Sequence, residues 1–223
     1  MVAIPPTRPS AALEDAAGAR TGALVIGVDE VGRGPLAGPV VAGAAVLDLG
    51  RLPETVAAGI ADSKALSPAR RAAALIAVGP YATLALGWAE VAEIDRLNIL
   101  NATFLAMHRA VDGLLGKLDG ASPTLVLVDG NRLPEWPYAA KAVIKGDTQC
   151  LSIAVAAIAA KQARDAEMAS LAMRYPGYGW ERNAGYGTAE HRAALAVQGP
   201  TPHHRRSFAP VRAAMLKQRT GSR

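Results

Sequence analysis

The sequence contains little cysteine, few aromatic residues and no long apolar run. The single cysteine among its 223 residues, Cys150, excludes an intramolecular disulfide and a cysteine-based metal cluster. No apolar run approaches the roughly 20 residues that span a bilayer, and residues 1–10 contain three prolines instead of a signal-peptide core. We therefore expect a soluble, cytoplasmic protein with no membrane partner, in which any metal is held by oxygen or histidine ligands.

Acidic residues are missing from the last part of the chain. Residues 191–223 include no Asp or Glu but seven Arg or Lys, in a chain whose net charge is +5. This distribution suits a polyanionic partner, and the alternative is a solvated basic tail without a ligand. The adjacent His203 and His204 are expected on the surface or at a phosphate.

Apolar residues make up 51% of the chain, enough for one well-cored domain. Residues 1–22 are expected to form a flexible leader. Glycine and proline divide the remainder into segments typical of strands and helices, the second strand running antiparallel to the first. The expected strands are 23–28, 40–47, 81–89, 124–128 and 140–144, and the expected helices are 67–78, 91–115 with a break near Asn98, 151–174 and 188–197.

The most informative stretch runs from residue 23 to residue 35. An apolar run ends in two adjacent carboxylates, Asp29 and Glu30, and these are followed by Gly32, Arg33 and Gly34. Successive strand side chains point to opposite faces, so the two acids can share a site only if the pleat relaxes at Glu30. Two acids this close repel each other unless Mg²⁺, Mn²⁺ or a proton neutralises them.

Two further acids follow apolar strands. Asp129 comes directly after the expected strand 124–128, and Asp147 follows the strand 140–144. Each alone is most simply a turn residue, but three strands that end in carboxylates indicate a cluster at one edge of a single sheet. Asp165 lies in the middle of the long helix, where an ion pair with Lys161 is the simpler interpretation.

On these residues the chain resembles the type 2 ribonucleases H, the bacterial ribonuclease HII family. The family's opening signature, Asp-Glu-x-Gly-Arg-Gly-x-x-Ala-Gly-Pro-Val, is matched at residues 29–40. Further similar stretches occur in family order between about residue 24 and residue 211. They are residues 62–64, 98–103, 128–130, 145–147, 159–161, 164–165, 185–188 and 204–208. A lone Asp-Glu pair carries little weight, whereas this ordered set is highly specific.

The resemblance implies an α/β fold, with a ribonuclease H-like mixed sheet flanked by helices. It also implies a small helical C-terminal segment that helps to clamp nucleic acid. The corresponding division of the chain is a leader at 1–22, a catalytic domain at 23–187, and a helical segment with a basic tail at 188–223.

The resemblance also implies a set of site residues. The family's four acidic active-site positions fall on Asp29, Glu30, Asp129 and Asp147. Of these, Asp29 would bridge two Mg²⁺ or Mn²⁺ ions, Glu30 and Asp129 would be further ligands, and Asp147 would hold the second ion or position a water. The substrate-binding positions fall on Gly32, Arg33, Gly34, Lys64 and Tyr186, the last being the tyrosine that senses the substrate.

The implied reaction is endonucleolytic, by two-metal hydrolysis that leaves 3′-hydroxyl and 5′-phosphate ends. Its substrates are the RNA strand of RNA/DNA hybrids and duplex DNA with one embedded ribonucleotide, cut on the 5′ side of that ribonucleotide. We expect a monomer, with a sliding-clamp contact through the C-terminal tail.

Two alternatives stay open at this point. Another ribonuclease H-like two-metal nuclease, of the resolvase or transposase type, gives no reason for the Gly-Arg-Gly and Gly-Tyr-Gly-Thr sequences together. A non-catalytic nucleic-acid-binding module leaves the four strand-end carboxylates unexplained.

Overall fold

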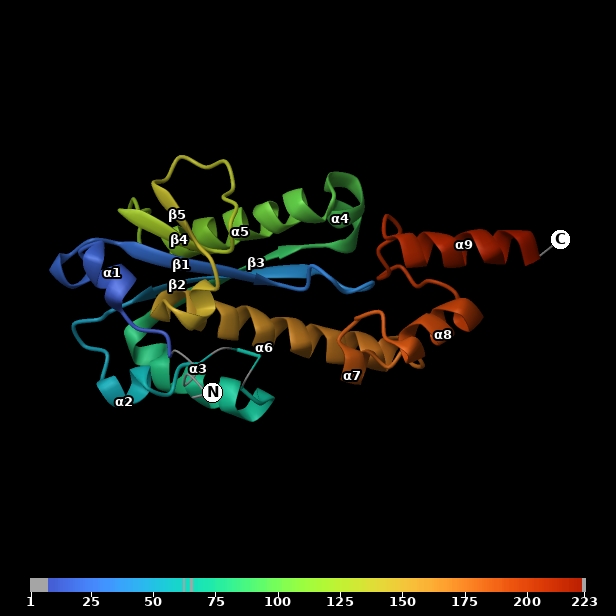
Figure 1. Cartoon of the computed structure of the whole chain (residues 1–223), viewed down its shortest axis with the longest axis horizontal. Helices are drawn as coiled ribbons and strands as arrows, with labels where there is room; N and C mark the ends of the chain where they lie inside the picture. Colours follow the sequence, from blue (N-terminus) through green and yellow to red (C-terminus); the bar gives the residue numbers. More distant parts are fainter. Residues whose placement is uncertain (1–7, 62, 65, 222–223) are drawn as a thin grey trace, which may run out of the picture. The chain divides into compact units, whose positions relative to one another are not determined.

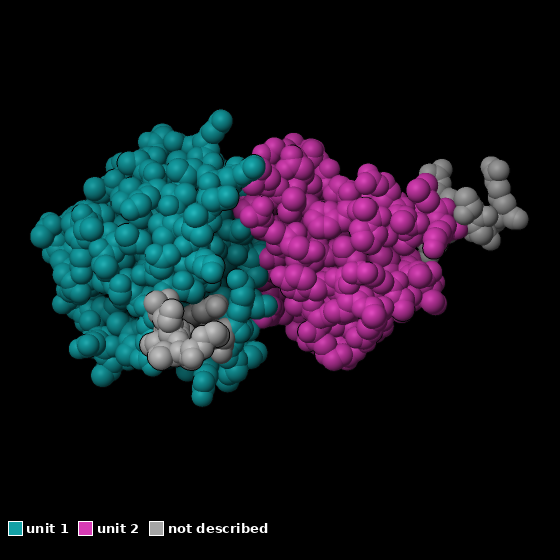
Figure 2. Space-filling model, viewed as in Figure 1, with its two compact units in different colours: residues 1–31, 41–88, 104–162 teal, residues 32–40, 89–103, 163–223 magenta. Residues whose placement is uncertain are grey.

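The computed structural model describes residues 8–61, 63–64 and 66–221, with side chains up to residue 217. Two compact units are present, coloured separately in Figure 2. Unit 1 comprises residues 1–31, 41–88 and 104–162, and unit 2 comprises residues 32–40, 89–103 and 163–223. Unit 2 is thus larger than the segment predicted from residue 188 onward, because residues 32–40 and 89–103 pack with the C-terminal part of the chain.

A mixed five-stranded sheet forms the centre of unit 1, as predicted. Its strands lie in the order β3-β2-β1-β4-β5. They are β1 (Val25–Val31), β2 (Val40–Leu47), β3 (Ala82–Ala89), β4 (Leu125–Asp129) and β5 (Ala140–Val143). β1 is antiparallel to β2, whereas β1 and β4, and β4 and β5, are parallel. The carboxyl ends of β1, β4 and β5 therefore meet at one edge of the sheet.

Helices cover both faces of this sheet (Figure 1). In unit 1, α5 (Ile99–Gly116) lies on one face, and α6 (Leu151–Arg174) and α3 (Pro68–Val78) lie on the other. α5 approaches β3 closely, since a Cβ atom on Gly87 would lie 2.0 Å from the carbonyl oxygen of Ala106. On the opposite face, buried residues of β2, α3 and α6 form one apolar cluster that includes Ala45, Val78 and Ile158.

The close fit of α6 against the sheet depends on small residues on both sides. The face of α6 toward the sheet carries small side chains such as Ala156 and Ala160, which are buried. On the strands, a Cβ atom on Gly27 would lie 2.3 Å from the backbone of Ile153, and one on Gly43 would lie 2.3 Å from the carbonyl oxygen of Ala156. The helix therefore rests on the backbone of β1 and β2.

Most predicted boundaries are confirmed within one or two residues. Ser67 caps α3, its hydroxyl accepting a hydrogen bond from the Arg70 amide, and the break between α4 and α5 falls at Asn98, whose φ is +69°. The other elements are α1 (Ala12–Ala16), η1 (Ala19–Thr21), α2 (Glu54–Ala57), η2 (Gly79–Tyr81), α4 (Val91–Leu97), η3 (Gly146–Thr148), α7 (Trp180–Asn183), α8 (Ala189–Gln198) and α9 (Ala209–Gly221).

The leader differs from the flexible segment that was predicted, over the part from residue 8 to residue 22. Ser10 exchanges backbone hydrogen bonds with the start of α6, donating to the Gln149 carbonyl (3.1 Å) and accepting from the Leu151 amide (3.2 Å). Glu14 on α1 is buried, and its Oε1 accepts from the Ser152 amide (2.8 Å) and the Cys150 thiol (3.1 Å). A carboxylate is stabilised there because the first amides of a helix lack partners inside it.

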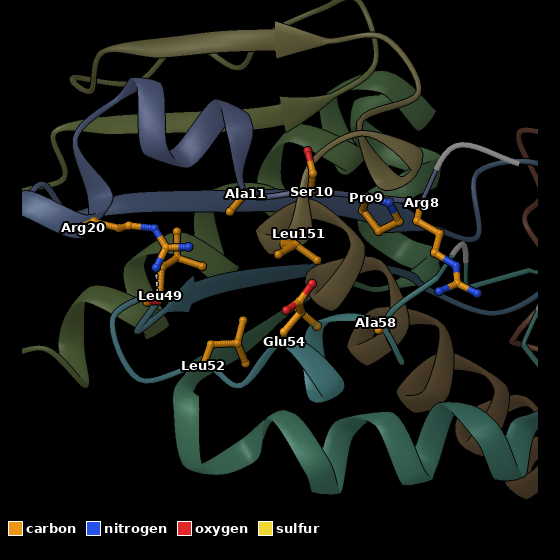
Figure 3. Close-up of a pocket in the computed structure, with 11 residues that line it drawn as sticks. Arg8, Pro9, Ser10, Ala11, Arg20, Leu49, Leu52, Glu54, Ala58 and Leu151 are labelled. Carbon is orange, nitrogen blue, oxygen red and sulfur yellow. Dashed lines mark hydrogen bonds between the residues drawn. The ribbon is translucent and has the colours of Figure 1, made fainter.

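A cavity of about 480 Å³ lies beside this segment (Figure 3). Its lining combines Arg8 and Arg20 with apolar residues such as Leu49 and Leu151. Arg20 donates to the Leu49 carbonyl and pairs with Asp15 (2.9 Å). None of the four predicted acidic site residues lines this cavity.

Unit 2 has its own apolar and aromatic interior. Met168, Leu171, Tyr178 and Trp180 form a buried cluster. Nearby, Asp95 connects α4 to the 204–208 stretch by accepting hydrogen bonds from the Arg206 and Ser207 amides. Among the helices of the described ranges, none is long and apolar enough to cross a membrane.

Candidate active site

Three of the four predicted acids lie at the carboxyl ends of neighbouring parallel strands. Val28 is in register with Val128, so Asp29 on β1 and Asp129 on β4 occupy equivalent positions. Asp129 is in turn in register with Val143, the last residue of β5. Asp147 follows β5 in η3 and is buried, like Asp29.

Burial and the neighbouring carboxylates both act on Asp29. Burial is the largest cause that raises the pKa of Asp29 well above its usual value, followed by the charges of Glu30, Asp129 and Asp147. A hydrogen bond from the Glu30 amide to Asp29 Oδ1 (2.6 Å) partly opposes this rise in pKa. A nearby cation would therefore stabilise the ionised form of Asp29.

The condition under which Asp29 and Glu30 could share a site, a pleat that relaxes at Glu30, is not met in the pairing of β1 with β2. β1 continues to Val31, with Glu30 paired to Ala42 and Val31 to Val41. A regular pleat turns neighbouring side chains to opposite faces. Consistent with this, no three His, Cys, Asp or Glu side chains within residues 8–61, 63–64 and 66–221 are gathered closely enough to hold a metal ion.

The turn that precedes Asp147 is hydrogen-bonded to the side chain of Asp129. Asp129 Oδ1 accepts a hydrogen bond from the Gly146 amide (2.6 Å), and Lys145 adopts a left-handed conformation with φ +55°. Gly146 itself is packed, because an added Cβ atom would lie 2.6 Å from Ile153 Cδ1. Asp129 and the start of α6 therefore hold the backbone of this turn, next to Asp147, in place.

The Gly32-Arg33-Gly34 sequence begins a loop of unit 2 in which Gly32 is buried. Gly32 has φ +95°, and a Cβ atom at this position would lie 2.1 Å from Arg164 Nε. Only glycine meets both conditions. Arg33 and Gly34 are exposed to solvent.

Tyr186 lies against this loop. Its side chain is 46% exposed, and a Cβ atom on Gly34 would lie 3.4 Å from Tyr186 Cε1. The backbone of Tyr186 is held on both sides: its amide donates to the Asn183 carbonyl (2.8 Å), and its carbonyl accepts from the Thr188 amide (2.8 Å) and His191 Nδ1 (2.9 Å). The structure thus brings two predicted substrate residues, Gly34 and Tyr186, into one place.

Two predictions about basic and histidine residues need correction. Arg205 and His204 belong to the expected solvated tail, but both are fully buried. Arg205 can be buried because backbone carbonyls, among them that of Gly38, accept its hydrogen bonds. His204 can be buried because its Nδ1 accepts a hydrogen bond from the Thr201 amide. Lys64 is exposed in the turn before α3, and Asp62 of the same motif lies outside the described residues.

Two buried arginines outside the predicted site are hydrogen-bonded to the segment that contains Gly32, Arg33 and Gly34. Arg164 on α6 and Arg205 in the 204–208 stretch donate to carbonyls of the 32–39 segment. A sequence signal existed for Arg164, because it follows the buried positions 153, 157 and 160 at helical spacing. The positive charge of the Arg164 side chain, by contrast, predicts an exposed position.

Comparisons with known proteins identify the family. A family model described as Ribonuclease HII matches residues 26–211. A ribonuclease HII from Rhodospirillum rubrum is 57% identical over 211 residues, which cover 94% of this chain and 93% of the relative.

Solved structures share the fold at lower identity. The ribonuclease H2 from Pyrococcus horikoshii OT3 superposes with a TM-score of 0.67 at 24% identity, covering 87% of this chain and 98% of that chain. Bst-RNase HIII in complex with Mn²⁺ gives 0.70 at 21% identity, covering 92% and 73%. The family match, the extent of the identity and the shared fold together show that this chain belongs to the ribonuclease HII family of metal-dependent endonucleases.

Proposed function

We propose that this ribonuclease H cuts the RNA strand of RNA/DNA hybrids and cuts duplex DNA on the 5′ side of a single embedded ribonucleotide. The products would carry 3′-hydroxyl and 5′-phosphate ends. The observation that supports this proposal most strongly is the alignment of Asp29, Asp129 and Asp147 at adjoining parallel strand ends.

The acid cluster suits a hard divalent cation. Its donors are carboxylate oxygens, the ligands that Mg²⁺ and Mn²⁺ prefer. The raised pKa of Asp29 indicates that the ionised cluster is costly without a positive charge. Since the side chains are not gathered at ligand distances, binding would require the carboxylates to rotate together. Bst-RNase HIII, which shares this fold, has been solved in complex with Mn²⁺.

The residues of the acid cluster would have two roles, to hold the cations and to orient the attacking water. When bound, two divalent cations would supply Lewis acidity to the attacking water and the leaving 3′ oxygen. Asp29 and Asp129 would hold the cations, Glu30 would join them once the pleat of β1 relaxes at this residue, and Asp147 would complete that set or orient the water through its carboxylate. Burial of Asp29 and Asp147 keeps bulk water away from both carboxylates.

Recognition of the substrate would fall to exposed groups. The exposed Gly34 allows backbone to approach a sugar, the buried Gly32 provides the left-handed turn that precedes it, and the ribose 2′-hydroxyl distinguishes RNA from DNA. Tyr186 would stack at the RNA-to-DNA junction, and Lys64 would contact a phosphate. A monomer and a sliding-clamp contact through the C-terminal tail remain part of the proposal.

Cleavage of end-labelled duplexes tests the proposal directly. One duplex carries a single ribonucleotide and the other is a continuous RNA/DNA hybrid, each incubated with Mg²⁺, Mn²⁺ or a chelator. We expect both to be cut only with a cation, with the single-ribonucleotide duplex cut on the 5′ side of that nucleotide. Cation-independent cutting, or cutting of all-DNA duplex at the same rate, would refute the proposal.

A further inference from the structure

Two guanidinium groups are fully buried in unit 2. Arg164 and Arg205 have no exposed surface, and burial lowers the pKa of Arg164 to about 10 and that of Arg205 to about 9, so both stay charged at neutral pH. A buried charge is costly unless its hydrogen bonds are satisfied. In the part of the chain that the structure describes, backbone carbonyls rather than carboxylates accept those bonds.

Arg205 lies inside the 32–39 loop. Nη2 donates to the Gly32 carbonyl (2.5 Å), Nη1 to the Arg33 carbonyl (2.9 Å), and Nε to the Gly38 carbonyl (2.9 Å). Nη2 also reaches the Pro39 carbonyl (3.2 Å). Leu36 and Ala37 of this loop pack in apolar clusters, and the cation binds carbonyls near both ends of the loop.

The direction of these bonds has a consequence for the exposed side of the loop. In a planar trans peptide the C=O and the following N–H point in opposite directions. Because the Gly32 and Arg33 carbonyls point at Arg205, the amides of Arg33 and Gly34 point away from it. Arg205 thereby sets the orientation of the backbone groups that the loop presents.

Arg164 connects the same loop to the turn that carries Tyr186. Nε donates to the Pro39 carbonyl (2.9 Å), Nη2 to the Ala37 carbonyl (3.2 Å), and Nη1 to the Ala184 carbonyl (3.0 Å). A backbone bond from the Leu36 amide to the Gly185 carbonyl (2.8 Å) joins the same two segments. Arg164 is thus the charged group shared by both.

We propose that Arg164 and Arg205 are positioning residues for substrate recognition: Arg205 keeps the 32–39 loop in shape, and Arg164 fixes that loop against the Tyr186 turn. This inference rests on the proposed function of the two segments. Neither guanidinium touches the substrate, since both lie beneath the loop. Loss of Arg164 should therefore affect junction sensing, whereas loss of Arg205 should affect every substrate that the loop contacts.

The test compares Arg164→Lys and Arg205→Lys with a matched control, Arg174→Lys, on the same helix as Arg164 but exposed. Lysine keeps the charge but cannot donate in three fixed directions. We expect Arg164→Lys to lower kcat/KM on the single-ribonucleotide duplex by roughly 10- to 100-fold, as for a misplaced recognition group, and to lower it much less on the continuous hybrid. Arg205→Lys should lower both, and Arg174→Lys neither.

Two further readouts separate positioning from folding. Each variant should unfold cooperatively, and Mn²⁺ should raise its melting temperature as in wild type, because the acid cluster belongs to unit 1. If Arg164→Lys does not fold, Arg164→Ala is assayed with and without methylguanidinium, which should restore cutting at the single ribonucleotide.

The outcomes distinguish the two levels of the proposal. A wild-type enzyme that cuts neither duplex refutes the proposed function. If the wild type cuts both duplexes, two results would overturn the positioning roles alone. One is a folded Arg164→Lys variant whose ratio of kcat/KM on the two duplexes is unchanged. The other is an Arg164→Ala variant that methylguanidinium does not rescue.

Discussion

The Nε2 atoms of His191 and His204 lie 3.0 Å apart in the interior of unit 2. His191 Nε2 also accepts from the Trp180 indole (3.1 Å), and His204 Nδ1 accepts from the Thr201 amide (3.0 Å). With His191 Nδ1 donating to the Tyr186 carbonyl, one neutral tautomer of each ring satisfies every ring nitrogen. A proton added at His191 Nε2 would face the Trp180 indole donor, and one added at His204 Nδ1 would face the Thr201 amide.

Acid should therefore destabilise the protein. Burial, and next the charges of His191 and His203, lower the pKa of His204 from 6.5 to about 3. Between these values the unfolded chain binds more protons than the folded one, so stability falls as the pH drops below about 6.5. At pH 5 the loss from His204 alone should approach about 2 kcal/mol. Urea unfolding at pH 7.5 and pH 5 measures it, and an equal pH slope in His204→Gln would contradict it.

Gly32→Ala and Gly34→Ala should differ sharply, although they lie in one loop. At Gly32 the positive φ costs about 1–3 kcal/mol, and the clash with Arg164 Nε adds about 1–3 kcal/mol. At Gly34 the new methyl group would only touch the Tyr186 ring. Melting temperatures of the two variants check this, and similar values would show that the loop yields more easily than its contacts indicate.

Asp29→Asn should abolish cleavage while binding of the duplex persists. Loss of one carboxylate disrupts the proposed cation site but leaves the basic surface unchanged, and removing a repelled buried charge should raise the melting temperature without metal. Mn²⁺ should then add little further stability, because a ligand stabilises only the state that binds it. Calorimetric scans with and without Mn²⁺ measure both effects. An undiminished rise would place the cation elsewhere.

Glu14→Ala should be costly and its neighbour Asp15→Ala nearly neutral. Glu14 is buried and accepts from the Ser152 amide, so its loss should cost about 1.5–3 kcal/mol. Asp15 forms an exposed ion pair with Arg20, which contributes less than about 1 kcal/mol. Denaturant midpoints compare the two, and equal losses would mean that the described part of the leader does not anchor α6.

Tyr186→Ala should slow cutting at a single ribonucleotide by roughly 5- to 150-fold, since aromatic stacking contributes about 1–3 kcal/mol. Tyr186→Phe, which keeps the ring, should lose less. Both should melt near the wild-type temperature, because the side chain is 46% exposed. Wild-type rates for Tyr186→Ala would leave the Gly32-Arg33-Gly34 loop as the sole candidate for sensing the junction.

Local patterns in the sequence account for much of the sheet and its helices. α6 begins and ends where predicted because residues 151–174 contain neither glycine nor proline, and α3 begins where Ser67 and Pro68 indicate. The equivalent placement of Asp29 and Asp129 also follows from two apolar strands that end alike. Strand pairing, by contrast, extends β1 past Asp29, because β2 keeps bonding as far as Val31.

Contacts between distant residues explain the remaining differences. Glu14 finds its partner 138 residues away in Ser152, and no periodicity within the leader reveals that. Arg164 and Arg205 are expected to be exposed by residue type, but carbonyls from two separate segments, the 32–39 loop and Ala184, make their burial possible. Charge predicts exposure only when the backbone offers no alternative to water.

The contact of α6 with Gly27 and Gly43 limits how this protein can vary. Gly43 pairs directly with Asp29, and helix backbone or side-chain atoms occupy the space where a Cβ atom of either glycine would stand. Random mutagenesis of unit 1 should therefore recover exchanges among Val, Ile and Leu across the sheet, yet return no substitution at these two glycines among active clones. The least chemically reactive residues in the sheet would be among the least replaceable.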